Sequence, residues 1–318
     1  MLCIACETDF DVNAEWEETM VIYGLLDLNT DTQYVKISKA FLGEMDALEM
    51  AQYADSINFG SYDTSGNYID ELAVKIYKWK FNEIKDSVAL TAVPTIRDAG
   101  IFNENIVVYE FVNNNSFLEN EYEYELVIDS GSVNIVSSRT KLVESFSFDN
   151  MANQFKFYKP LNPDTTKFTL ETIKWSDANN ATMYQLTVRI NYTENNDTLY
   201  LDWRQPLEST ENLTILEGKS FFSFLEASKE LEVNTPNTVR RFQTIDLYLT
   251  AGTADLYTYM QVNEPITGIV QQRPYFTNIN NGIGLFSSRY SLVKKGMVLS
   301  DDTKDYVRDN LGLSFESN

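Results

Sequence analysis

Residues 20–39 read MVIYGLLDLNTDTQYVKISK, and this stretch decides the fold class. An apolar run over residues 20–26 meets the polar sequence at residues 27–31, and residues 34–39 then alternate apolar and polar side chains. Successive side chains of a strand face opposite sides, so two such segments around a polar turn predict an antiparallel β-hairpin.

The turn of this hairpin has a second interpretation. Asp27, Asn29 and Asp31 have the spacing with which a calcium loop begins, where alternate oxygens converge on one cation. Such a loop continues with Gly at its sixth position and Glu at its twelfth, whereas Thr32 and Ser38 occupy those positions here. The sequence therefore favours a hairpin turn over a metal site.

The same alternation recurs further along the chain. Residues 72–79 and 122–128 repeat the period of two. The 19 Tyr, 19 Phe and 4 Trp residues also favour strands. We expect residues 18–145 to form one antiparallel β-sandwich, with a helix over residues 44–55 in a long loop.

A second sandwich is expected over residues 146–300. Residues 168–175 form a strand that ends in Trp175, and residues 181–190 form a strand that carries Tyr184. This spacing resembles fibronectin type III and other immunoglobulin-like modules, which implies that the two aromatic side chains pack between sheets. The predicted fold class is mainly β: two immunoglobulin- or fibronectin-like sandwiches with a few short helices in loops.

Short helices are expected within this second unit. Residues 220–227 have a helical pattern with Ser220 as the N-cap, and residues 254–262 form another short helix. Residues 244–250 alternate as a strand between them, and residues 301–318 are expected to be a C-terminal tail.

Composition limits the chemistry that the chain can perform. The 47 acidic and 25 basic residues give a net charge of −22, which argues against nucleic-acid binding because such binding needs Lys and Arg to neutralise phosphates. Histidine is absent, and Cys3 and Cys6 are the two cysteines. Imidazole-dependent catalysis therefore has no residue to use, and the absence of any cysteine after residue 6 argues against thiolate catalysis, so only carboxylate, Lys or Tyr chemistry remains. We expect a non-enzymatic protein without cofactor or metal.

The first residues have the pattern of a bacterial lipoprotein signal. A short apolar run ends in Ala5 directly before Cys6, and acidic residues follow. We predict that residues 1–17 comprise a signal remnant, the lipid-anchor cysteine Cys6 and an acidic tether. The signal is called a remnant because a complete one has a basic segment and a longer apolar core. The alternative is that Cys3 and Cys6 are buried thiols or an intracellular C-x-x-C pair.

Three segments carry a family resemblance. They are the strand at residues 21–26, the segment at residues 34–40 and above all residues 275–289, whose core at residues 278–286 reads Asn-Ile-x-x-Gly-x-Gly-x-Phe. Together they resemble a family of Bacteroidota outer-membrane lipoproteins of unknown function that are commonly encoded beside TonB-dependent receptors. The resemblance implies attachment to the outer membrane through Cys6, on its periplasmic or cell-surface face, and an outer-membrane protein as partner.

The core of this signature also has a structural interpretation. Gly282 and Gly284 let the backbone turn or approach another strand closely, while Ile283 and Phe286 can bury their side chains. We expect residues 278–286 to tuck back and close a sandwich, in preference to contacting a ligand.

Exposed aromatic side chains beside polar ones would indicate carbohydrate binding. The candidates are Trp203 with Asp202 and Arg204, and Trp79 with Tyr77. Both groups lie in alternating segments where one aromatic of each pair faces inward, so packing in the core is the competing interpretation.

Two functions fit these features. The first is a non-enzymatic accessory lipoprotein that acts by protein–protein contact beside a TonB-dependent receptor or an outer-membrane assembly machine. The second is a surface lipoprotein that binds a glycan or a small ligand through Trp203, Asp202 and Arg204. A carboxylate-dependent enzyme and a phage or fimbrial structural protein are further alternatives.

Overall fold

The computed structural model describes residues 19–40, 57–96, 105–113, 117–131, 134–160, 167–209, 211–232, 238–264 and 274–316. Strands predominate in them, so the predicted mainly β class is confirmed. The helix predicted over residues 44–55 and the anchor Cys6 lie outside the described residues. None of the described helices is long and apolar enough to span a membrane.

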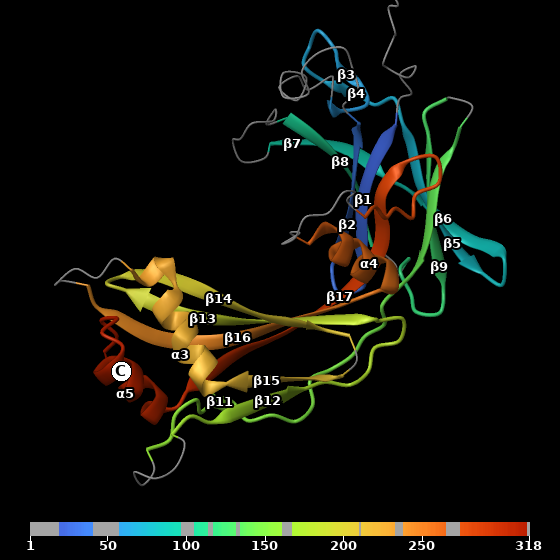
Figure 1. Ribbon diagram of the computed structural model, residues 1–318. Coiled ribbons are helices and arrows are strands. Elements are labelled where there is room, and N and C mark those ends of the chain that lie inside the picture. The colour runs from blue at the N-terminus through green and yellow to red at the C-terminus, as the bar shows by residue number, and fades with distance from the viewer. Residues whose placement is uncertain are drawn as a thin grey trace, which may run out of the picture.

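The largest sheet has nine strands and extends from one end of the molecule to the other (Figure 1). Eight of its strands follow the order β14 (Asp197–Glu208), β13 (Met183–Glu194), β16 (Arg240–Gly252), β17 (Ile283–Leu299), β1 (Met20–Asp27), β2 (Thr32–Lys39), β8 (Asn105–Val112) and β7 (Thr91–Ile96). The ninth strand, β11 (Gln154–Phe155), pairs with β17.

Smaller antiparallel sheets and short helices complete the described fold. One sheet has the order β10 (Val136–Lys141), β9 (Glu123–Asp129), β5 (Ala73–Lys80) and β6 (Glu83–Ala89). Two strand pairs are β12 (Leu170–Lys174) with β15 (Leu213–Glu217), and β3 (Ser61–Tyr62) with β4 (Tyr68–Ile69). The helices are α3 (Gly218–Ala227), the 3-10 turn η2 (Lys229–Leu231), α4 (Ala254–Asn263) and α5 (Asp301–Asn310).

The predicted hairpin is formed by β1 and β2, which pair antiparallel. Its turn is held by the buried side chain of Gln33, whose Nε2 donates to the carbonyl oxygens of Asp27 (2.9 Å) and Thr30 (2.8 Å). Its Oε1 accepts from the Asp27 amide at 2.9 Å. The hairpin interpretation of this polar segment is therefore confirmed.

Two hydrophobic cores lie along the large sheet. The first joins Ile22 of β1 to Ile76 of β5 and Leu126 of β9, and so packs the large sheet against the four-stranded one. The second packs β13, β14 and β16 against β12, β15 and α3 (Figure 1). Trp175 and Tyr184 are both buried in it, with ring centroids 5.3 Å apart. Their predicted packing in a core is confirmed.

Strand β17 connects the two cores. Phe286 near its start belongs to the first core, and Met297 near its end belongs to the second. It pairs antiparallel with β16 and parallel with β1, so the expectation of a purely antiparallel sandwich is wrong at this place. A long connection separates β1 from β17, and no tight turn dictates their relative direction. The strand that follows the signature is therefore central in the sheet.

Helix α3 begins earlier than the sequence predicts. Glu217 has an extended backbone and is the N-cap, so Ser220 lies inside the first turn and its predicted capping role is wrong. The Ser220 hydroxyl instead contacts the Glu217 carboxylate at 3.3 Å. A side chain at position 218 would overlap the carbonyl oxygen of Phe157, so glycine is required where β15 turns into the helix.

Other predicted elements also appear in the second half of the chain. The helix predicted over residues 254–262 is α4, and the strand predicted over residues 244–250 lies within β16. Residues 301–318, expected as a tail, contain α5. Beyond α5, the Phe315 ring stacks on Phe242 with centroids 4.0 Å apart, so this segment contributes to the second core.

In the signature at residues 278–286, the side chain of Asn278 forms hydrogen bonds with the backbone of β17. Asn278 donates from Nδ2 to the Phe286 carbonyl (2.8 Å) and accepts the Phe286 amide on Oδ1 (3.0 Å). The same Nδ2 donates to Asp255 in the first turn of α4 (2.8 Å), and Ser138 of β10 donates to the Asn278 carbonyl (2.8 Å). Asn278 thus joins α4, β10 and β17.

The partly buried Tyr68 and the buried Tyr109 and Tyr124 should make the fold sensitive to alkaline pH. Burial raises the pKa of Tyr68 to about 12, and it also raises the pKa of Tyr109 and of Tyr124. An unfolded tyrosine ionises near pH ~10, so above that pH the folded state holds more protons than the unfolded state. Stability that is present below pH ~10 is therefore lost as the pH rises toward the folded pKa values.

We expect the urea midpoint of unfolding to fall steadily above about pH 10, with tyrosinate absorbance rising as the protein unfolds. A midpoint that stays constant up to about pH 12 would contradict the assignment of these tyrosines as buried and protonated.

Candidate functional site

Trp203 on β14 is 8% exposed and packs inside the second core. Its ring centroid lies 5.8 Å from that of Phe221 and 5.9 Å from that of Phe224, both on α3, and 6.1 Å from that of Phe157. The predicted carbohydrate platform at Trp203 is therefore wrong, because the Phe-rich face of α3 covers the indole.

Asp202 and Arg204 lie on the opposite face of β14 from Trp203. Asp202 accepts two hydrogen bonds from Arg189 of β13, from Nε and from Nη2, each at 2.7 Å. These bonds raise the pKa of Arg189, whose guanidinium carbon also lies 3.9 Å from the centre of the Tyr200 ring. Arg204 is exposed. The three predicted ligand residues are thus not gathered into one site.

The second aromatic pair is placed differently. Lys78 faces the first core and is 6% exposed, whereas Tyr77 and Trp79 are partly buried on the outer face of the four-stranded sheet. The expectation that one aromatic of this pair faces inward is therefore wrong, because residues two apart in a strand lie on the same face. The guanidinium carbon of Arg139 lies 4.4 Å from the centre of the Trp79 ring. Within the described residues, the buried Trp79 Nε1 has no hydrogen-bond partner. Of the aromatic residues predicted to bind a ligand, Trp79 is therefore the one that borders a surface cavity.

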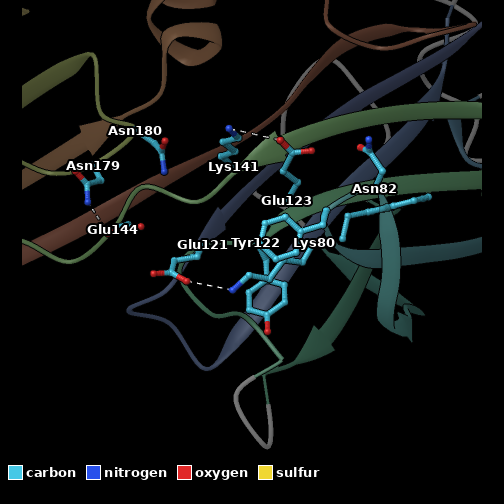
Figure 2. A pocket seen from close by; sticks show the side chains of 11 residues that line it. Lys80, Asn82, Glu121, Tyr122, Glu123, Lys141, Glu144, Asn179 and Asn180 are labelled. Atoms are coloured by element: carbon cyan, nitrogen blue, oxygen red, sulfur yellow. Dashed lines mark hydrogen bonds and ion pairs between the residues drawn. The ribbon is translucent and has the colours of Figure 1, made fainter.

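This cavity is a cleft of about 630 Å³ between segments that are distant in sequence (Figure 2). The β5–β6 turn, the segment entering β9 and the end of β10 supply one wall, and residues 144 and 179–180 supply the other. The lining side chains are Trp79, Lys80, Phe81, Asn82, Glu121, Tyr122, Glu123, Lys141, Glu144, Asn179 and Asn180.

Two ion pairs lie inside the cleft. Lys80 Nζ is 3.1 Å from Glu121 Oε2, and Lys141 Nζ is 3.5 Å from Glu123 Oε1 (Figure 2). Pairs with this much exposure contribute about 0–1 kcal/mol. Their charged groups can therefore exchange partners for a ligand at little cost in stability.

Three asparagine side chains supply neutral hydrogen-bonding groups. Asn179 Nδ2 donates to Glu144 Oε2 at 2.8 Å, and Asn180 Nδ2 donates to the Leu142 carbonyl at 2.9 Å. The Asn82 side chain forms no hydrogen bond with any residue that the structure describes. The cleft thus keeps amide donors and acceptors available for a ligand.

The rim of the cleft concentrates left-handed backbone. Phe81, Asn82, Glu121 and Asn180 have φ values of 53°, 61°, 67° and 65°, and they are four of the seven non-glycine residues with positive φ in the described ranges. Asn tolerates this conformation, whereas Phe and Glu adopt it at a cost of about 1–2 kcal/mol. Backbone strain of this kind clusters at functional sites.

The turn between β5 and β6 holds Phe81 in this strained conformation. Phe81 and Asn82 are the two central residues of a hairpin in which Lys80 pairs with Glu83. Two-residue hairpin loops of the type that best matches strand twist need positive φ at both central positions. The turn leaves the Phe81 side chain 87% exposed at the rim of the cleft.

Of the residues that line the cleft, the sequence predicted Trp79 alone as a binding residue, and its predicted companion Tyr77 does not line the cleft. Phe81 and Asn82 carry a signal that could have been used, because they form a two-residue gap between alternating segments. Asn179 and Asn180 carry none, since only the fold brings them opposite the β5–β6 turn.

Comparison with known proteins adds no function to this geometry. A scan against models of protein families found no match to the chain, and a search of curated proteins found no significant match. The relation to Bacteroidota lipoproteins therefore stays a prediction from the quoted segments.

Proposed function

We propose that this protein is a non-enzymatic accessory lipoprotein of the outer membrane, held by a lipid on Cys6, that binds an outer-membrane protein. A TonB-dependent receptor or an assembly machine is the class of partner that the family resemblance implies. One observation carries the proposed contact: Phe81 is 87% exposed and is held on a strained turn beside the cleft. Aromatic side chains presented in this way are typical anchors of protein interfaces.

The proposal includes a finer description of the fold. Two immunoglobulin- or fibronectin-like sandwich domains would span residues 18–145 and 146–300. The two hydrophobic cores support this division, because each is packed mainly by residues of one of these ranges. The first domain would present Phe81, and the second would present Asn179 and Asn180 on the facing wall of the cleft.

Phe81→Ser should weaken binding of the partner by about thirtyfold and reduce its recovery accordingly, because loss of an anchoring aromatic residue typically costs ~2 kcal/mol or more. The lipidated protein would be purified from solubilised outer membranes of a Bacteroidota host, and co-purified proteins would be quantified by mass spectrometry. Ile96→Ser is the matched control, because Ile96 is also strongly exposed, at 75%, and lies on β7 away from the cleft lining.

Equal recovery of the same outer-membrane protein with wild type and Phe81→Ser would refute the role of the turn. Mass spectrometry of the mature N-terminus tests the anchor in the same preparation. A cytosolic product without lipid on Cys6 would overturn the proposal as a whole.

Glycan binding is a second candidate that the cleft itself favours. Trp79 and Tyr122 offer aromatic surface, while Asn82, Asn179 and Asn180 offer amide groups for hydroxyls. Binding of the purified protein to a glycan array, lost on Asn82→Ala, would favour this function over protein contact. The site would then be the cleft at Trp79, because Trp203 is in the core.

A further inference from the structure

A groove of about 490 Å³ runs beside helix α4 and shares no lining residue with the cleft at Phe81. Strands β1 and β2, helix α4 and strand β17 all contribute to it. In Figure 1, α4 is the orange helix beside β1 and β17. This groove is separate from the cleft on which both proposed functions depend.

The middle of the groove is apolar. Leu25 of β1 and Leu285 of β17 pack with Leu256 and Met260 of α4 in a small hydrophobic cluster of their own. Leu256 and Leu285 are buried, whereas Leu25 and Met260 are partly exposed. These flexible and branched side chains offer apolar surface that suits an alkyl chain.

Tyrosine side chains line the groove next to this apolar surface. Tyr23 and Tyr34 are 43% and 53% exposed. Tyr259 of α4 donates its hydroxyl to Tyr23 Oη at 3.2 Å, with the two rings edge to face at 5.9 Å. Burial raises the pKa of Tyr259 to about 12, so this tyrosine remains a neutral donor at physiological pH. The tyrosines therefore add aromatic surface without adding charge.

Arg289 supplies the positive charge of the groove. Its Nε lies 3.5 Å from Asp27 Oδ2, and its side chain is 44% exposed. Asp27 is turned inward and is 2% exposed, and its oxygens accept from the Asn29 amide (2.9 Å) and the Ser291 hydroxyl (2.8 Å). In the part of the chain that the structure describes, the terminal amines of Arg289 donate no hydrogen bond. A guanidinium with two free parallel donors binds a carboxylate well.

The parallel register of β1 and β17 fixes the distance between Arg289 and Tyr23 along the groove. Tyr23 is paired with Leu285 and Asp27 with Arg289, so the two positions are four residues apart on each strand, or ~13 Å. We propose that the groove binds a medium-chain carboxylate, with its acid group on Arg289 and its alkyl chain along Leu25 toward Tyr23. Among the described lining residues Arg289 is the one cation, and its partner Asp27, which also lines the groove, is turned inward and accepts from Asn29 and Ser291 as well.

The test is a calorimetric titration of the purified protein with decanoate, decanol and acetate. Decanoate should bind at least about tenfold more tightly than decanol, which lacks the acid, and acetate, which lacks the chain, should not bind measurably. Arg289→Gln should bring decanoate affinity down to the level of decanol. Arg204→Gln is the matched control, because Arg204 is also exposed but lies outside the groove, and it should bind like wild type.

A second variant reports on the alkyl chain. Tyr34→Ala should weaken decanoate and decanol by the same factor, because Tyr34 adds exposed aromatic surface to the groove and is not a member of the Arg289–Asp27 ion pair. Urea unfolding of each variant confirms that it is folded. Equal affinities for decanoate and decanol, an unchanged affinity in Arg289→Gln, or no binding of decanoate to the wild-type protein would each overturn the proposal.

Discussion

Replacing Gly284 by alanine should destabilise the protein by about 3–5 kcal/mol. Gly284 has a φ of 113°, a conformation that L side chains rarely adopt. A Cβ at this position would overlap the backbone oxygen of Ile22 on β1. Gly284 and Ile22 are register partners in the parallel pair, so β1 and β17 would have to separate to accommodate it. Equilibrium unfolding in urea measures the loss, and Gly284→Val should cost at least as much.

Gly296 provides a control within the same strand. It also has a positive φ, of 82°, but a Cβ added there would meet nothing within 4 Å. Gly296→Ala should therefore show only the backbone strain, about 1–2 kcal/mol. Equal losses for the two variants would mean that the contact with Ile22 contributes nothing. If Gly284→Val keeps a normal melting temperature but loses partner binding, the signature is a recognition loop and its structural interpretation is wrong.

Local patterns in the sequence predicted the local structure. The β1–β2 hairpin was predictable because its turn and both alternating strands lie within residues 20–39. The packing of Trp175, directly after β12, on Tyr184 of β13 was expected because their spacing resembles that of fibronectin-like modules. Such features need no knowledge of what the rest of the chain does.

Features that depend on distant segments were not predictable. The parallel pairing of β1 with β17 depends on a connection through most of the chain. The start of α3 depends on Phe157, whose carbonyl oxygen leaves room only for a glycine at position 218. Ser220 was a reasonable N-cap by residue type, but residue type alone does not show where the preceding strand ends.

The side of the strand on which an aromatic residue lies decides whether that residue reaches the surface. In β5, Val74 and Ile76 face the first core, and Lys78 continues the same phase although it is charged. Its Nζ is accommodated by Glu119 at 3.1 Å and by the ring of Tyr122 at 4.2 Å. Because Lys78 is buried, Trp79 lies on the other side of the strand and faces the cleft. An assignment by residue polarity alone would have placed Lys78 outside and Trp79 in the core.

A buried arginine holds the end of the chain to the large sheet. The Arg240 side chain is fully buried; its Nε donates to Glu194 Oε2 at 2.6 Å, and its Nη1 donates to the carbonyl oxygen of Leu313 at 2.8 Å. Its backbone amide donates to Ser314 and its carbonyl accepts from Glu316, both at 2.9 Å. One residue thus joins β13, β16 and the segment after α5 through both its side chain and its backbone.

Arg240→Ala should destabilise the protein by about 3–5 kcal/mol, since removing the fully buried guanidinium, whose partner Glu194 is 29% exposed, leaves a cavity and unsatisfied polar groups. Arg241→Ala is a control at the adjacent position: its ion pair with Glu316 is about half exposed, and its loss should cost less than about 1 kcal/mol. Urea unfolding gives both values, and limited proteolysis should cleave after residue 310 sooner in Arg240→Ala than in Arg241→Ala. If the two variants unfold at the same urea concentration, the buried pair does not hold the C-terminal segment. The packing of Phe315 on Phe242 would then be what retains that segment on the sheet.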